Sequence, residues 1–221
     1  MSTTDSSSNA WGLQHHFDSY EQQQEASYFG MWLFLAQEIM FFGGLFTAYI
    51  VYRTAHPEAF AIGSHELDIR LGAINTAVLI GSSLTMALAV WAAQKGSRKL
   101  LVAFIIGTIL LGGVFLGIKK VEYEHKWHEH HFPGPSFQWE GPEAPHVEMF
   151  FNLYFAMTGL HALHMVVGMA IMLVMIPLAW RGTWTTDNHN FVEGMGLYWH
   201  FVDIVWIFLF PLLYLLGRNG V

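Results

Sequence analysis

Five long apolar stretches constrain the fold of this chain more than any other feature of its sequence. A helix needs about 20 mostly apolar residues to cross a bilayer, and each stretch comes near to that length or exceeds it. Of all residues, 53% are apolar and only 12% are charged, which is unusual for a soluble domain. We therefore predict an all-α, polytopic membrane protein whose transmembrane helices lie at about 28–51, 71–93, 100–118, 149–179 and 192–216.

Two polar segments lie outside these helices. Residues 1–27 are rich in Ser and Gln and lack the basic and apolar regions of a signal peptide, so we interpret them as an N-terminal arm to the membrane domain at 28–221. Residues 119–146 are rich in His and Glu and interrupted by prolines, which predicts a surface loop that contacts partners. Imidazole and carboxylate groups there could also hold zinc or copper. Because His-rich tracts bind metals adventitiously, we predict no metal site.

The composition excludes several classes of function. The chain has no cysteine, so it can form no disulfide, thiolate metal site or thiol nucleophile. Its net charge is −7, whereas nucleic-acid binding requires a basic face. We therefore expect no nucleic-acid partner.

Basic residues bear on the orientation, because they favour the cytoplasmic side of a membrane. Lys95, Arg98 and Lys99 crowd the turn after the second span, which favours a cytoplasmic N-terminus and a C-terminus outside. The opposite side nevertheless carries more basic residues in total. Charge counts alone therefore leave the orientation open.

Polar side chains inside the spans follow helical spacing. In the last span, Glu193, His200 and Asp203 are seven and three residues apart and share one helix face. An ionisable group inside a bilayer costs on the order of 3 kcal/mol, so this face should contact protein. Asn75 in the second span, and His161 with His164 in the fourth, indicate similar faces. Glycines at 107, 112, 113 and 117 predict a close helix contact along the third span.

Glu38 stands out because it lies roughly 15 Å into the first span at the helical rise. No basic residue follows it within two turns, and a bare carboxylate is costly at that depth. We expect Glu38 to be protonated or hydrogen-bonded to a neighbouring helix. It could act in a proton relay or a lipid contact, or serve as a buried strut, and the sequence leaves these interpretations open.

Two alternatives of another class follow from the same side chains. Neutral histidine is a good axial ligand of haem, so His161 or His164 could pair with His200 in a membrane cytochrome. The first three spans contain no histidine, which leaves at most one such pair. A free-standing proton carrier could use Glu38, but the internal repeats and discontinuous helices typical of carriers are not evident.

Several motifs occur in the order of one known family. They are AQEIMFF at 36–42, NTAVL at 75–79, Glu122 with Tyr123, TGLHALH at 158–164, and Glu193 with YWHFVD at 198–203. At these positions the chain resembles subunit III of haem–copper oxidases, the cytochrome c oxidase subunit III family, and the resemblance covers all five spans. It is similar to the short five-helix bacterial form, because the seven-helix form has two further N-terminal helices.

The resemblance implies an accessory subunit of a terminal oxidase in aerobic respiration that is not itself catalytic. Haem and copper would be carried by partner subunits. It implies direct packing against subunit I, in a complex with subunit II and small subunits that could join a respiratory supercomplex. It also implies the bacterial cytoplasmic membrane and support of proton uptake, with Glu38 as the family's membrane-embedded glutamate. A cytochrome c oxidase is our first choice, with subunit III of a quinol oxidase or the related accessory protein of nitric oxide reductase as alternatives.

The resemblance further implies bound phospholipids. They would occupy a cleft between two helix groups, formed by the first two spans and by the last three. Basic side chains near the interface, namely Arg53, His56 or Arg98, could hold the lipid head groups.

Overall fold

The computed structural model describes residues 17–134, 137–139, 141–184 and 189–218, and all regular structure in these ranges is helical. Within these ranges, five helices are long and apolar enough to cross a membrane, which confirms the predicted all-α fold. In chain order the elements are α1 (Tyr20–Ala55), α2 (Pro57–His65), α3 (Ile69–Gln94), α4 (Arg98–His128), α5 (Ala144–Arg181), α6 (Asn190–Phe210), the π-helical turn η1 (Pro211–Leu215) and the 3₁₀ turn η2 (Leu216–Arg218).

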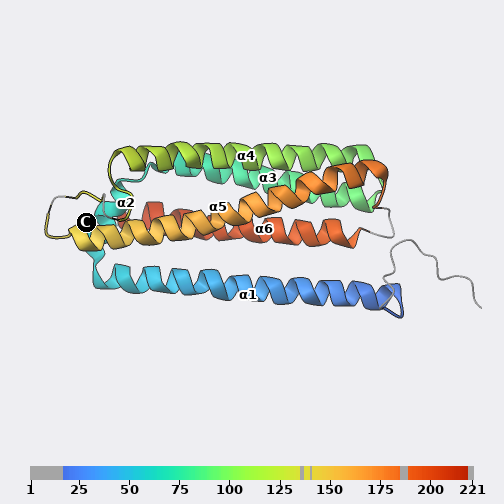
Figure 1. Cartoon of the computed structure of the whole chain (residues 1–221), viewed down its shortest axis with the longest axis horizontal. Helices are drawn as coiled ribbons and strands as arrows, with labels where there is room; N and C mark the ends of the chain where they lie inside the picture. Colours follow the sequence, from blue (N-terminus) through green and yellow to red (C-terminus); the bar gives the residue numbers. More distant parts are fainter. Residues whose placement is uncertain (1–16, 135–136, 140, 185–188, 219–221) are drawn as a thin grey trace, which may run out of the picture.

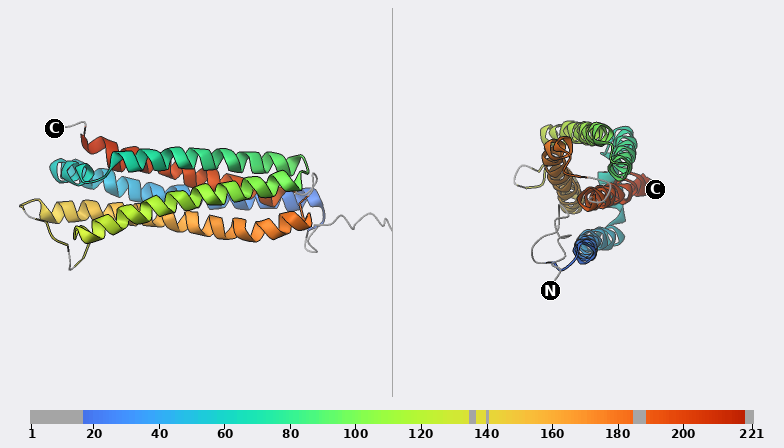
Figure 2. Two further views of the ribbon diagram at one scale, coloured as in Figure 1. Left: turned by 90° about the horizontal axis from the view of Figure 1, so that it is seen from above. Right: turned by 90° about the vertical axis from the view of Figure 1, so that its right-hand side faces the viewer.

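Four of the spans form a bundle, and α1 lies beside it. In the end-on view of Figure 2, α3, α4, α5 and α6 surround a common core while α1 stands apart from them. α3 packs against α4 and α6, and α5 packs against both α4 and α6. α1 packs against α5 and α6 (Figure 1).

This arrangement corrects the predicted division into the first two spans and the last three, because α3 belongs to the bundle. The tight turn at 95–97 makes α3 and α4 neighbours in space. On the other side, the indole N–H groups of Trp199 and Trp206 on α6 donate to Ser82 and Thr76 on α3, at 2.9 and 3.1 Å. Between α1 and α3 in the chain, α2 packs against α5 and η2.

The helices extend beyond several predicted limits. α4 ends at His128 rather than near 118, so the first part of the predicted loop at 119–146 is helical. Ion pairs at helical spacing, such as Lys120 with Glu124 at 3.6 Å, support this extension. α1 begins at Tyr20, where Ser19 accepts a hydrogen bond from the backbone N–H of Gln22. Residues 1–16 of the predicted arm lie outside the described residues.

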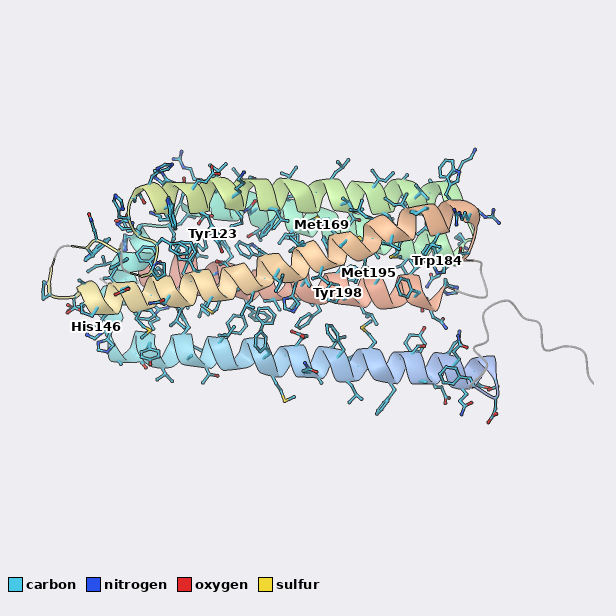
Figure 3. The ribbon with its side chains drawn as sticks, in the orientation of Figure 1. Tyr123, His146, Met169, Trp184, Met195 and Tyr198 are labelled. Atoms are coloured by element: carbon cyan, nitrogen blue, oxygen red, sulfur yellow. The ribbon has the colours of Figure 1, made fainter. Side chains whose placement is uncertain are left out.

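Two glycines allow the bundle helices to approach closely. A methyl group added at Gly168 of α5 would lie 2.9 Å from the Tyr198 ring, and one added at Gly112 of α4 would lie 3.1 Å from the sulfur of Met169. Figure 3 labels Met169 of α5 and Tyr198 of α6. Gly113 and Gly117 of α4 have no atom within 4 Å of such a methyl group. Of these glycines on the third span, Gly112 therefore makes the close contact.

Candidate functional site

Glu38 joins α1 to the bundle halfway along the helix. Its Oε2 lies 3.1 Å from Nε2 of His164 on α5, and Glu38 is only 8% exposed. Nδ1 of His164 lies 2.8 Å from the carbonyl oxygen of Leu160, and the ring of Phe42 packs against the imidazole. Glu38 is thus hydrogen-bonded to a neighbouring helix, as its depth in the span requires.

A hydrogen bond between Glu38 and His164 requires a proton between their facing atoms. A carbonyl oxygen only accepts hydrogen bonds, so Nδ1 of His164 must donate to Leu160. Nε2 then either accepts from a protonated Glu38 or, in an imidazolium, donates to its carboxylate. The pair has no net charge in either form, which limits the cost of burying it.

Glu193 ties α1 to the bundle at the end where α6 begins. Its carboxylate accepts hydrogen bonds from Tyr28 of α1 and, at 2.8 Å, from Gln94 of α3. Nε2 of His189 lies 3.1 Å from the same carboxylate. One side chain therefore joins three helices, and Tyr28 and Gln94 are partners that the sequence analysis did not identify.

A buried ion pair lies near the other end of the bundle. Nζ of Lys119 is 3.0 Å from Oε2 of Glu122, and both residues are 4% exposed. The hydroxyl groups of Tyr154 and Tyr214 donate to Oε1 of Glu122, the first at 2.8 Å. Nζ also lies 4.7 Å from the centre of the Trp206 ring, a favourable position for a cation. These contacts lock α4, α5, α6 and η1 together.

Lys119 is the member of this network that sequence reasoning missed. With the span ending near 118, Lys119 falls in an extramembrane loop, where a lysine needs no partner. The i,i+3 spacing of Lys119 and Glu122 was the signal that could have revealed both the longer helix and the pair.

A second charge cluster lies where α4 ends. Lys126 is 3% exposed, and its Nζ lies 2.6 Å from Glu129 and 3.7 Å from Glu66. Nδ1 of His131 is 3.4 Å from Glu129. Ligand atoms of Glu66, Glu129 and His131 lie within 4.8 Å of one another, as metal ligands would. The Lys126 ammonium already pairs with both carboxylates and offsets one of their two negative charges, so the cluster contains a cation without a metal ion.

The same cluster shifts two pKa values. Burial, together with the positive charge of Lys126, holds the pKa of the His131 imidazole below its usual value. Burial would raise the pKa of Glu129, but the hydrogen bond and charge of Lys126 outweigh it and leave that pKa lowered.

The other polar residues that were predicted to face protein lie inside the bundle. His161 is fully buried, with Nε2 3.1 Å from the Val202 carbonyl oxygen, and its ring packs between Phe115 and Trp206. Nδ1 of His200 lies 2.7 Å from Oγ of Ser83. Asn75 and Asp203 are buried. Since His161 and His164 use Nε2 for contacts with the protein, this geometry does not favour the haem alternative.

An apolar cavity lies between α1, α5 and α6, beside the contacts that α1 makes with these two helices. Its volume is about 910 Å³. Aromatic and aliphatic side chains line most of it, and His164 lies at one boundary. Polar side chains gather towards the end where α1 begins and α5 ends; they are Gln23, Ser27, Thr183 and Asn190. Trp184, Met195 and Tyr198, labelled in Figure 3, belong to its lining.

The three residues predicted to hold lipid head groups lie at different ends of the molecule. A methyl group added at Gly182 would meet the Arg98 guanidinium, which places Arg98 beside the end of α5. Arg53 donates to the carbonyl oxygen of Leu216. The imidazole of His56 stacks on that of His146, with centroids 3.6 Å apart. Arg53 and His56 lie near the C-terminal end of α1, and therefore far from the polar side chains of the cavity.

These features define a class: a polytopic helical membrane protein in which ionisable side chains join helices within the bundle. Comparison with known proteins identifies the family. The family model of cytochrome c oxidase subunit III matches residues 13–218. The chain therefore belongs to the cytochrome c oxidase subunit III family and is an accessory subunit III of a haem–copper oxidase, partnered by other oxidase subunits.

Three relatives illustrate the range of this similarity. The chain is 30% identical to cytochrome bo(3) ubiquinol oxidase subunit 3 of Pseudomonas aeruginosa, over 92% of this chain and 91% of the relative. It is 34% identical to cytochrome c oxidase subunit 3 of Synechocystis, over 85% and 75%. It is 36% identical to quinol oxidase subunit 3 of Bacillus spizizenii, over 86% and 87%. Relatives of comparable identity thus include both cytochrome c and quinol oxidases.

Proposed function

We propose that this accessory subunit packs directly against subunit I, retains phospholipid beside α1 and supports proton uptake by the oxidase. Haem and copper belong to the partner subunits in this proposal. The observation that carries it is the attachment of α1. This helix is held by polar contacts at Glu193 and Glu38, with an apolar cavity beside them.

The chemistry of the cavity supports a phospholipid as its occupant. An apolar space of this size within a membrane favours acyl chains over water. At one end, the hydroxyl groups of Ser27 and Thr183 and the amide group of Asn190 place hydrogen-bonding atoms where an ester or head group would lie. Arg98 lies beside Gly182, next to Thr183, which supports Arg98 among the three candidates for a head-group contact. Arg53 and His56 instead contact Leu216 and His146.

The burial of two lysines supports a cytoplasmic N-terminus. Of the basic residues near the C-terminal end, Lys119 and Lys126 are buried and paired with carboxylates. A lysine whose charge is paired inside the bundle presents no free positive charge at the membrane surface. The exposed cluster Lys95, Arg98 and Lys99 then weighs more. We propose a bacterial cytoplasmic membrane with the N-terminus inside and the C-terminus outside.

Purification of the tagged chain after mild detergent extraction tests the assembly. We expect a haem–copper subunit I and a subunit II to co-purify in equal amounts with it. A copper-bearing subunit II and oxidation of reduced cytochrome c would identify a cytochrome c oxidase. Quinol oxidation without that copper would identify a quinol oxidase. Recovery of the chain without any haem protein would contradict the proposal.

Native mass spectrometry of the complex tests the lipid. Val167 lines the cavity, so Val167→Trp should fill it and lower the amount of retained phospholipid. Val166, the adjacent residue, is exposed and does not line the cavity, so Val166→Trp is the matched control. Equal lipid retention in the two variants would contradict a lipid in this cavity.

A further inference from the structure

Asp203 is a buried carboxyl group without an opposite charge. It is 3% exposed, and among the described residues it takes part in no ion pair. Ser83 interacts with Asp203, yet neither carboxyl oxygen has a partner with good hydrogen-bond geometry among those residues. A carboxylate would be costly in this position, whereas a protonated carboxyl group would not.

A groove reaches His200, which lies one helical turn before this side chain. It has a volume of about 330 Å³ and lies between α1, α3 and α6. Tyr28 and Glu193 line it at the end where α6 begins, and His200 lines it deeper in the span. Glu193 and His200 are seven residues apart, which corresponds to about 10 Å along a helix. The groove is large enough to hold several water molecules.

His200 and Ser83 connect the groove to Asp203. Nδ1 of His200 lies 2.7 Å from Oγ of Ser83, and Ser83 interacts with Asp203. A hydroxyl group can accept one proton while it donates another, and a neutral imidazole can take up a proton on one nitrogen and release one from the other. The groove, the imidazole and the hydroxyl group thus lie in order towards the carboxyl group, and the last transfer requires Ser83 and Asp203 to move into hydrogen-bond geometry.

We propose that Asp203 is a proton-binding site connected to the surface at Glu193 by the groove, His200 and Ser83. In uptake, His200 receives a proton from water in the groove and releases the proton on Nδ1 to Ser83. Ser83 passes its own hydroxyl proton to the Asp203 carboxylate. Asp203 gains one proton and the surrounding water loses one. His200 is left as its other neutral tautomer and Ser83 with its hydroxyl proton turned, and both reorient before the next transfer.

Other titratable groups on the packed helices are engaged elsewhere. His161 of α5 contacts the Val202 carbonyl oxygen, and Lys119 of α4 is paired with Glu122. Glu38 of α1 is bonded to His164. The proposed route is therefore separate from the Glu38–His164 pair, and its failure would leave the assignment as subunit III intact.

Infrared spectroscopy of the intact oxidase in lipid nanodiscs tests both parts of the proposal. We expect a carbonyl band of a protonated carboxylic acid that is lost in Asp203→Asn. In D₂O this band should shift rapidly in the unmodified protein. The shift should slow by about tenfold in Ser83→Ala, the effect of removing one hydrogen-bonded carrier.

Two further variants separate the route from general loss of structure. Ala87 lines the groove and is exposed, so Ala87→Phe should block water and slow exchange, whereas Leu84→Phe, on the exposed face outside the groove, should not. Ser82→Ala removes the neighbouring hydroxyl, which accepts from Trp199, and should leave the exchange rate unchanged. Absence of a band assigned to Asp203, or equal exchange rates in Ser83→Ala, Ala87→Phe and their controls, would overturn the proposal.

Discussion

Glu38 of α1 and His164 of α5 are 126 residues apart in the chain, and their side chains meet at 3.1 Å inside the membrane-spanning region. This contact fixes α1 to a bundle that it otherwise contacts sparingly (Figure 1). Apolar side chains of α1 give the helix little preference for one position against the bundle, because they contact lipid tails as favourably as they contact other apolar side chains. This polar pair, together with the contacts of Tyr28 with Glu193 and of Arg53 with Leu216, therefore specifies where α1 attaches.

Glu38→Ala should weaken this attachment without altering the metal centres of the partner subunits. Loss of a buried hydrogen bond costs on the order of 1–3 kcal/mol. We expect unchanged haem spectra and initial rate, but a shorter functional lifetime during turnover. Glu38→Gln should recover part of the lifetime, since its amide can donate to Nε2. If Glu38→Ala abolished the initial rate, as loss of a metal ligand would, this role of Glu38 would be refuted.

Lys119→Met should destabilise the bundle strongly. It leaves the Glu122 carboxyl group buried among the Tyr154 and Tyr214 hydroxyls without its cation, and breaking a buried pair in this way costs about 3–5 kcal/mol. The measurement is the thermal unfolding temperature of the complex. The double variant Lys119→Met with Glu122→Leu should recover much of the loss, because no charge is then left unpaired. If Lys119→Met alone were as stable as the original protein, the stabilising role of the ion pair would be contradicted.

Acidification should loosen the end of α4 in two stages. The folded protein lowers the pKa of His131, so its contribution to stability is present above the usual value of 6.5 and is lost below it. The pKa of Glu129 is lowered from 4.5, so its contribution is lost at more acidic pH. Backbone hydrogen exchange at 129–131 should therefore accelerate first below about 6.5. His131→Phe should remove this first stage only, and exchange independent of pH in this range, after correction for intrinsic rates, would disprove it.

The glycines of the bundle provide a test of helix packing. A methyl group at Gly168 would lie 2.9 Å from Tyr198, so Gly168→Ala should destabilise the α5–α6 contact by about 1–3 kcal/mol. Gly113→Ala meets nothing within 4 Å and should be neutral or slightly stabilising, because Ala favours helix. Thermal unfolding of the two variants gives the comparison. Equal unfolding temperatures would show that the close contact is absent.

Much of the candidate site could be predicted from helical spacing. Glu193, His200 and Asp203 share a face in the sequence, and in the structure Glu193 and His200 line one groove while Asp203 lies a turn further in. The cost of an ionisable group in a bilayer forces such residues towards protein, so their general placement follows from their depth. The hydrogen-bond partners of these residues cannot be predicted from depth. Ser83, Gln94 and Tyr28 come from other helices and carry no signal in the sequence that distinguishes them from other polar residues.

The sequence by itself determined the five spans, the polar faces and the family, because apolar length, residue spacing and motifs are local properties. Only the tertiary structure decided that α3 packs with α4 and α6 while α1 stands apart. It also decided that Lys119 is buried against Glu122 and that Gly113 faces open space. Helix neighbours depend on how side chains of distant segments fit together and which polar groups they satisfy. Several pairings would place the same apolar stretches in the membrane, and the fit of particular side chains selects one of them.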